Sequence, residues 1–164
     1  MFEPLKKLKP NLVKTIQMWE KTYQDAINHL PGNVSFRALP PSDVDYYAQF
    51  DLTKYNYDDD IEQYAHDLCQ MLSESFSKRK AINDNMIPTI SPVLGIGDYS
   101  AFVAGDIIFQ PETSWSKPVL KEITDYKKLP PLGQAKWYQK FLKICEALLK
   151  LSADSGIPFM RGFF

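Results

Sequence analysis

The chain has 164 residues, and its size and composition are those of a folded globular domain rather than a disordered segment. Hydrophobic residues make up 45% of it and aromatic residues 13%, whereas disordered chains are poor in both. Lysine and arginine total 19 against 20 aspartates and glutamates, a formal net charge of −1. A balance this even creates no overall positive field, so we expect neither a nucleic acid nor a membrane surface as partner.

The N-terminal residues, the lack of a long apolar run and the cysteines lead us to expect a cytoplasmic location. The lysine-containing N-terminal residues are not followed by an apolar run of signal-peptide length, and no segment approaches the roughly 18 apolar residues of a membrane span. Cys69 and Cys145 both fall inside helical patterns. We therefore expect buried thiols in a reducing compartment rather than a disulfide framework.

Three segments show the apolar spacing of an amphipathic helix, and we expect helices over residues 11–30, 58–80 and 134–154. Pro31 follows the first of these, and Gly156 stands where a C-terminal glycine would end the last. The apolar stripes of the three helices predict a set of buried side chains that includes Trp19, Leu68, Phe141 and Leu148.

Three other segments favour β-strands, near residues 33–39, 86–94 and 157–164. The second is apolar although it contains Pro88 and Pro92, which a strand tolerates only near its ends or at a bulge. A short helix ending near Gly105 and a brief strand at 106–109 are inserted after it. Strands that alternate with helices predict an α/β fold, with three parallel strands joined by helical crossovers and flanked by helices.

The most conspicuous motif reads Gly95-Ile96-Gly97-Asp98-Tyr99-Ser100 and resembles a dinucleotide-binding turn. Its third glycine is replaced by Ser100, so the spacing favours a plain tight turn. Two interpretations of Asp98 remain open. It is either a catalytic carboxylate beyond the carboxyl end of a strand, or simply the N-cap of the following helix.

Metal and nucleotide motifs are weak or missing in this sequence. His66 and Cys69 lie three residues apart on one predicted helix, but no second pair of ligands completes a tetrahedral zinc site. The aspartates between 51 and 60 lack the glycine and the glutamate of a calcium loop. The sequence also contains neither a nucleophile-elbow serine nor a phosphate-binding P-loop. We therefore expect no metal or cofactor site in this chain.

From about residue 61 to 164 the chain resembles the uroporphyrinogen decarboxylase (URO-D) family in the order of its features. An apolar helix precedes a strand that opens with Ile87-Pro88, and residues 101–109, AFVAGDIIF, are similar to the family's Ala-x-x-x-Gly step before a short β segment. Residues 115–120, WSKPVL, look like its aromatic-x-x-Pro loop. A short helix ending in a leucine before a proline linker, a long helix and a proline-initiated strand then follow at 121–164.

This resemblance implies that residues 1–164 form a partial uroporphyrinogen decarboxylase-like domain, the N-terminal part of a truncated (β/α)₈ (TIM-type) barrel. The full-length protein would be an enzyme, acting either in corrinoid/thiol methyl transfer or, as a lyase of porphyrin biosynthesis, in tetrapyrrole decarboxylation. Its partner would be a small-molecule substrate, a tetrapyrrole or a methyl donor, or else a corrinoid protein. If it is a methyltransferase, zinc and a corrinoid are implied, with zinc ligands beyond residue 164.

The resemblance also assigns two site residues. The family's Arg-Gln-Ala-Gly-Arg signature, whose arginines hold substrate carboxylates, corresponds to Arg37-Ala38-Leu39-Pro40-Pro41 here. Arg37 is therefore the expected substrate-binding residue, although the second arginine is missing. The family's strand-two aspartate falls near Ile96, two positions from Asp98, and on that match Asp98 is the expected catalytic residue.

A second interpretation belongs to another class of protein: a small non-catalytic α/β module for binding or interaction. The two interpretations differ in what the chain should do alone. A fragment with three parallel strands would expose a strand edge and apolar faces, so we expect it to be inactive and to associate. A complete module would be a stable monomer with a cooperative unfolding transition.

Overall fold

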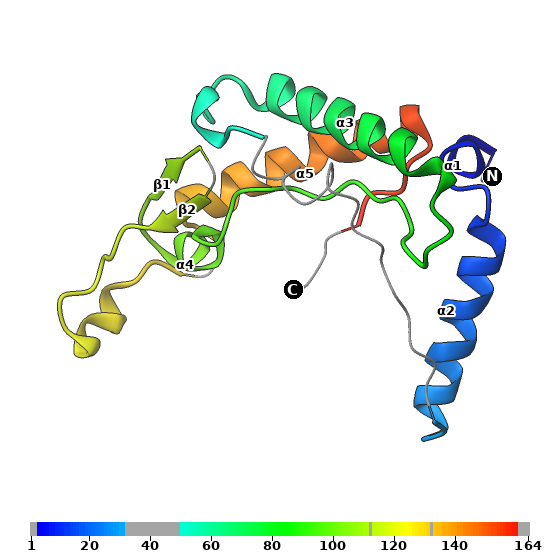
Figure 1. Ribbon diagram of the computed structural model, residues 1–164. Helices are drawn as coiled ribbons and strands as arrows, with labels where there is room; N and C mark the ends of the chain where they lie inside the picture. The colour runs from blue at the N-terminus through cyan, green and yellow to red at the C-terminus, as the bar shows by residue number, and fades with distance from the viewer. Residues whose placement is uncertain (1–2, 32–49, 112, 132, 161–164) are drawn as a thin grey trace.

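The computed structural model describes residues 3–31, 50–111, 113–131 and 133–160, most of them helical (Figure 1). In chain order the main elements are α1 (Glu3–Leu8), α2 (Leu12–Ile27), α3 (Ile61–Lys78), α4 (Asp98–Val103), β1 (Ile107–Gln110), β2 (Thr113–Ser116) and α5 (Lys136–Ser155). Three short 3₁₀ helices lie between them, namely η1 (Leu52–Lys54), η2 (Arg79–Ala81) and η3 (Ile123–Lys128).

The core lies between α3 and α5, which run side by side in Figure 1. Their apolar stripes face each other, and Leu68, Phe141 and Leu148 are buried as the sequence predicts. Burying one such side chain stabilises the fold by about 1.5–3 kcal/mol. The other side chains that the two helices bury are Ile61, Tyr64, Ala65, Cys69, Leu72, Phe76, Trp137, Lys140, Ile144 and Ala147.

Gly156 ends α5, as the sequence predicts. Its φ of 69° is left-handed, a conformation that glycine adopts without the steric cost of a side chain. A Cβ at this position would also lie 2.8 Å from the Cγ of Pro4, so the end of α5 is packed directly against α1. The helix end therefore needs glycine for two separate reasons.

Helix α2 is present, but its apolar stripe is not covered as expected. Figure 1 shows α2 leading away from the α3–α5 pair. Its buried residues are Leu12, Thr15 and Asp25, whereas the side chain of Trp19 is 41% exposed. The indole N–H of Trp19 donates to the backbone oxygen of Asn85 at 2.9 Å, which holds the ring at the rim of the fold. The expectation that Trp19 is buried was wrong.

The predicted fold, three parallel strands from a (β/α)₈ barrel, was also wrong. The only sheet in the described part of the chain is the antiparallel pair of β1 and β2. Residues 86–94 and 157–160 are extended but meet in a single parallel bridge between Ile90 and Phe159. The first predicted strand, 33–39, and the last four residues of the predicted strand at 157–164 lie outside the described residues.

Prolines explain why this bridge does not grow into a ladder. The amide of Ile90 donates to the Pro158 oxygen at 2.9 Å, and the Met160 amide donates to the Ile90 oxygen at 2.8 Å. In a parallel pair the next groups on the same edge belong to residues two positions away. Those residues are Pro88 and Pro92, which have no N–H to donate, and Pro158 cannot donate back to Pro88.

The hairpin is partly the strand expected near 106–109. Strand β1 confirms that strand, and its residue Ile107 pairs with Ser116 in the antiparallel register. Strand β2 was not expected, because 115–120 was interpreted as a loop and the sequence TSWS has one apolar side chain. It is a strand because β1 supplies its backbone partners.

Both cysteines of the chain are free thiols. Cys69 is a buried free thiol on α3, and Cys145 is half-buried on α5. Burial raises the pKa of the Cys69 thiol, which disfavours its reactive thiolate form at neutral pH.

Across the described ranges, no helix combines the length and the apolar character needed to cross a bilayer.

Candidate functional site

The two site residues expected from the sequence differ in what the structure says of them. Arg37 lies outside the described residues. Asp98 is the first residue of α4 and is half-buried, and its Oδ1 accepts the backbone N–H of Tyr99 at 2.7 Å. Gly97 occupies the N-cap position, so the interpretation of Asp98 as the N-cap was wrong.

The turn that precedes Asp98 is packed tightly against the hairpin. Gly95 has a φ of 79°, and a Cβ there would lie 2.8 Å from the backbone nitrogen of Ser114. A Cβ on Gly97 would lie 2.6 Å from the backbone nitrogen of Ser116. Both glycines are therefore required by the approach of β2, and the turn needs no bound nucleotide to account for them.

Ser114 ties this turn to β2 through its side chain. The residue is fully buried, and its hydroxyl donates to the backbone oxygen of Leu94. The same Oγ accepts the N–H of Gly97 at 3.2 Å. The Ser114 hydroxyl thus makes a hydrogen bond with a backbone group at each end of the turn. These two hydrogen bonds offset the free-energy cost of removing the hydroxyl from water.

The segment that leads into the turn is held from the core by Tyr64. The Tyr64 hydroxyl donates to the Val93 oxygen at 2.6 Å and accepts the Val93 amide at 2.8 Å. Burial of this ring raises the pKa of Tyr64 well above its ordinary value, so the phenol stays neutral and can donate. The position of residues 93–98 is therefore fixed from two sides, by α3 and by β2.

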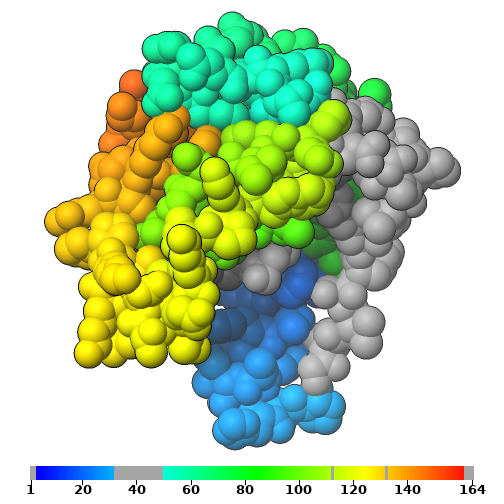
Figure 2. All heavy atoms as spheres, turned by 90° about the vertical axis from the view of Figure 1, so that its left-hand side faces the viewer, coloured from blue at the N-terminus to red at the C-terminus, as the bar shows by residue number. Residues whose placement is uncertain are grey.

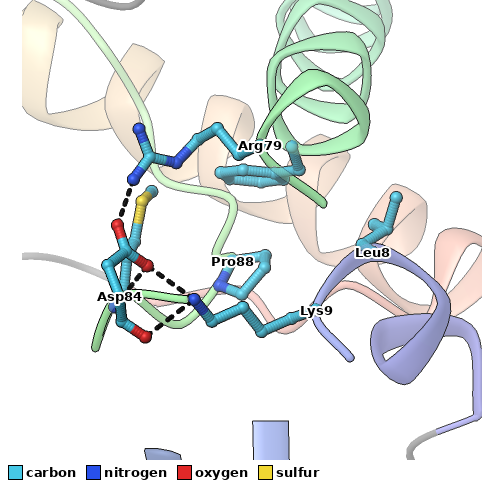
Figure 3. A pocket seen from close by; sticks show the side chains of 7 residues that line it. Leu8, Lys9, Arg79, Asp84 and Pro88 are labelled. Atoms are coloured by element: carbon cyan, nitrogen blue, oxygen red, sulfur yellow. Dashed lines mark hydrogen bonds and ion pairs between the residues drawn. The ribbon is translucent and has the colours of Figure 1, made fainter. Parts of the chain in front are cut away.

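A second cluster of functional groups, which the sequence did not indicate, joins α1 to the end of α3 (Figure 3). Lys9, Arg79 and Asp84 are all buried, and both cationic side chains reach the Asp84 carboxylate. The Lys9 ammonium lies 2.5 Å from Asp84 Oδ1 and 2.8 Å from the backbone oxygen of the same residue. Arg79 contacts the other carboxylate oxygen through a guanidinium nitrogen.

The charge state of Asp84 follows from these contacts. Burial acts to raise the pKa of its carboxyl group, but the hydrogen bonds from Lys9 and from the Met86 amide, together with both cationic charges, outweigh that effect. The pKa is therefore lowered below its ordinary value of 3.8. Asp84 is ionised at neutral pH, and the cluster is a buried ion pair with two cations.

The hollow beside this cluster is too small for a substrate. It has a volume of about 10 Å³, is lined on its apolar side by Leu8, Phe76, Met86 and Pro88, and has room for about one water molecule. Asn11 also donates to the Asp84 backbone oxygen, at 3.2 Å. The cluster therefore holds the junction between α1 and α2 against the loop that follows α3, which is a structural role.

A wider hollow lies open on the surface between α3 and α5. It has a volume of about 350 Å³, and His66, Cys69 and Asp154 are among the residues that line it. Nowhere in the described ranges do three His, Cys, Asp or Glu side chains come together as metal ligands would. The zinc and corrinoid that the resemblance associates with methyl transfer therefore gain no ligand set from these residues.

Comparisons with family models, with curated proteins and with solved structures find no match to this chain.

Proposed function

We propose that the chain is part of an enzyme similar to uroporphyrinogen decarboxylase, acting either in tetrapyrrole decarboxylation or in methyl transfer between a corrinoid and a thiol. The order of features from residue 61 to 160 supports this proposal. Helix α3, the short helix α4, strand β1, η3 and α5 follow one another in the order of the features on which the resemblance rests. The proposal concerns the activity and does not depend on the barrel fold.

The observation on which the proposal rests is the position of Asp98. Residues 86–94 and 157–160 run in the same direction where they meet at Ile90, and Asp98 begins α4 directly after the turn that follows the first segment. A half-buried carboxylate is accessible enough to exchange a proton with a bound substrate, which supports a role for Asp98 in the chemistry.

The two expected residues then take separate roles. Asp98 supplies a carboxylate for proton transfer, or for stabilising positive charge as it develops on the substrate. Arg37 binds a substrate carboxylate, because its planar guanidinium can donate two parallel hydrogen bonds to one carboxylate group. These roles are compatible with both decarboxylation and methyl transfer, and the two assays described next distinguish the two reactions.

The test is turnover by the full-length gene product, in one assay for carbon dioxide release from uroporphyrinogen and one for methyl transfer from methylcobalamin to a thiol. We expect activity in one assay, a loss of about 10²- to 10⁴-fold in Asp98→Asn, and a loss of about 10- to 100-fold in Arg37→Ala. Asp125→Asn removes a carboxylate from an exposed pair with Lys128 and serves as the matched control. Activity in neither assay would refute the proposal.

A second candidate function, a non-catalytic interaction module, is favoured by one specific observation. Five large apolar side chains on or just after α2 are exposed, namely Val13, Trp19, Tyr23, Ile27 and Leu30. In Figure 2, α2 (blue) extends beyond the other coloured residues. Apolar patches of this kind are typical of protein interaction sites. A monomeric 164-residue chain that unfolds cooperatively and has no affinity for tetrapyrrole or corrinoid would favour this function over the enzyme.

A further inference from the structure

We infer that Ser114 is a positioning residue for Asp98, so that the β1–β2 hairpin sets the place of the candidate catalytic carboxylate. Ser114 itself is too far inside the fold to meet a substrate, since it is fully buried. Its role is to hold the turn from Leu94 to Gly97 through its hydroxyl. The inference rests on the proposed function only for its consequence in catalysis.

The chain of contacts from Ser114 to Asp98 is short. Gly97 donates its N–H to Ser114 and is directly followed by Asp98, whose carboxylate accepts the Tyr99 N–H. Gly95 and Gly97 allow the turn to lie against the β2 backbone, so little space is left for the turn to shift. Displacing Gly97 therefore displaces Asp98 with it.

The hairpin can act as a fixed support because it is anchored in the core. The ring of Phe109 on β1 is stacked on Tyr57, with 4.7 Å between the ring centroids. Trp137 on α5 meets both rings edge-on, at 5.4 Å from each. Aromatic contacts of this kind stabilise a fold beyond the contribution of the apolar area that they bury. The support behind Ser114 is therefore rigid compared with an isolated two-stranded hairpin.

Ser114 also differs from the neighbouring polar residues of the hairpin. Thr113 and Ser116 are only half-buried, and Ser114 is the buried member of β2. It pairs with Phe109, so its side chain is on the same face of the sheet as the anchored ring. This register brings the Ser114 hydroxyl into contact with the turn. A shift of the register by one residue would place the hydroxyl on the opposite face of the hairpin.

The test uses the chain labelled with ¹⁵N at glycine and tyrosine, and it follows the amide resonances of Gly97 and Tyr99. In Ser114→Ala both should move from their wild-type positions, and in Ser114→Thr, which keeps the hydroxyl, both should return towards them. Ser116→Ala is the matched control on the same strand and should leave both in place. If Ser114→Ala folds poorly, Ser114→Cys takes its place in the test. Cysteine keeps the size of the side chain but hydrogen-bonds weakly, so the same resonances should move.

The Gly97 amide donates to Ser114 Oγ, so its resonance moves whenever that hydrogen bond is lost. The Tyr99 resonance is therefore decisive, because a purely structural role of Ser114 would lower the unfolding free energy but leave the Tyr99 resonance unmoved. That outcome, in either the alanine or the cysteine variant, would overturn the inference. In the turnover assay of the full-length protein, Ser114→Ala should lower kcat by about 10- to 100-fold with a smaller change in KM. If the resonances move but Asp98→Asn retains full activity, the catalytic role of Asp98 fails while the positioning of the turn by Ser114 stands.

Discussion

Helices α2 and α3 look alike in sequence and differ in what surrounds them. Both have apolar side chains at helical spacing, and both are long, but α3 buries seven of its residues and α2 three. Helix α3 packs along α5, whereas within the described ranges no helix or strand has an extensive contact with α2. The periodicity of a sequence therefore predicts a helix and its apolar face, but not the element that covers that face.

The largest change in unfolding free energy is expected at the ion-pair cluster that connects the start of α2 to the loop after α3. Asp84→Ala should lower the unfolding free energy by about 3–5 kcal/mol, because Lys9 and Arg79 would lose their shared carboxylate in a buried site. Urea unfolding measures the change. Asp125→Ala breaks the exposed pair with Lys128 and should cost about 0–1 kcal/mol. Equal losses in the two variants would contradict the structural role of the cluster.

The next effect separates the two apolar faces directly. Leu68→Ala on α3 should cost about 2–5 kcal/mol, because it opens a cavity at a fully buried position. Ile27→Ala on α2 should cost less than about 1 kcal/mol, because that side chain is already 54% exposed. Thermal unfolding of both variants gives the comparison. A comparable loss in Ile27→Ala would show that the α2 face is covered in solution.

Acid should act on the same contact with a definite sign. The pKa of Asp84 is lower in the folded chain than its ordinary value of 3.8, so its contribution to the unfolding free energy is complete above about pH 5. It is lost as the pH falls towards the folded pKa. Wild-type unfolding free energy should therefore fall more steeply below pH 4 than that of Asp84→Asn, as measured by urea titrations at several pH values. Parallel slopes would show that the ion pair does not form.

The smallest effect on stability is expected on the exposed end of α2. Tyr23→Ser combined with Ile27→Ser should change the unfolding free energy by no more than about 1 kcal/mol, since both side chains are more than half exposed. The same variant should reduce any association of the chain, as measured by sedimentation, because it removes apolar surface. Unchanged association would locate the contact elsewhere, for example at the exposed side chains of Val119, Ile123 and Tyr126.

Local features of this fold could be predicted from the sequence. The three long helices, the short strand before Gln110 and the glycine that ends α5 all follow from neighbouring residues, and each is present. Burial of Leu68, Phe141 and Leu148 followed because α3 and α5 cover each other. Burial of Trp19 failed because it needed a partner for α2, which periodicity cannot supply.

Features that depend on residues far apart in the chain could not be predicted in the same way. Lys9 and Asp84 are 75 positions apart, and Lys9 looks like any surface lysine in a lysine-rich N-terminal segment. Ser114 stands in a polar tetrapeptide whose burial comes from the turn 17 residues earlier. The pattern that favoured strands at 86–94 and 157–164 described single segments, whereas the extent of their pairing depends on which residues face each other.

The prolines around the Ile90–Phe159 bridge also restrict how the chain can misfold. If residues 86–94 slipped by two positions in either direction, Pro88 or Pro92 would take the place of Ile90 and the hydrogen bond to the Pro158 oxygen would be lost. A slip by one position would turn every side chain to the wrong face. The same missing donors make this edge a poor template for a strand from another molecule. The prolines prevent an extended ladder, and they also restrict residues 86–94 to a single alignment with the segment that contains Phe159.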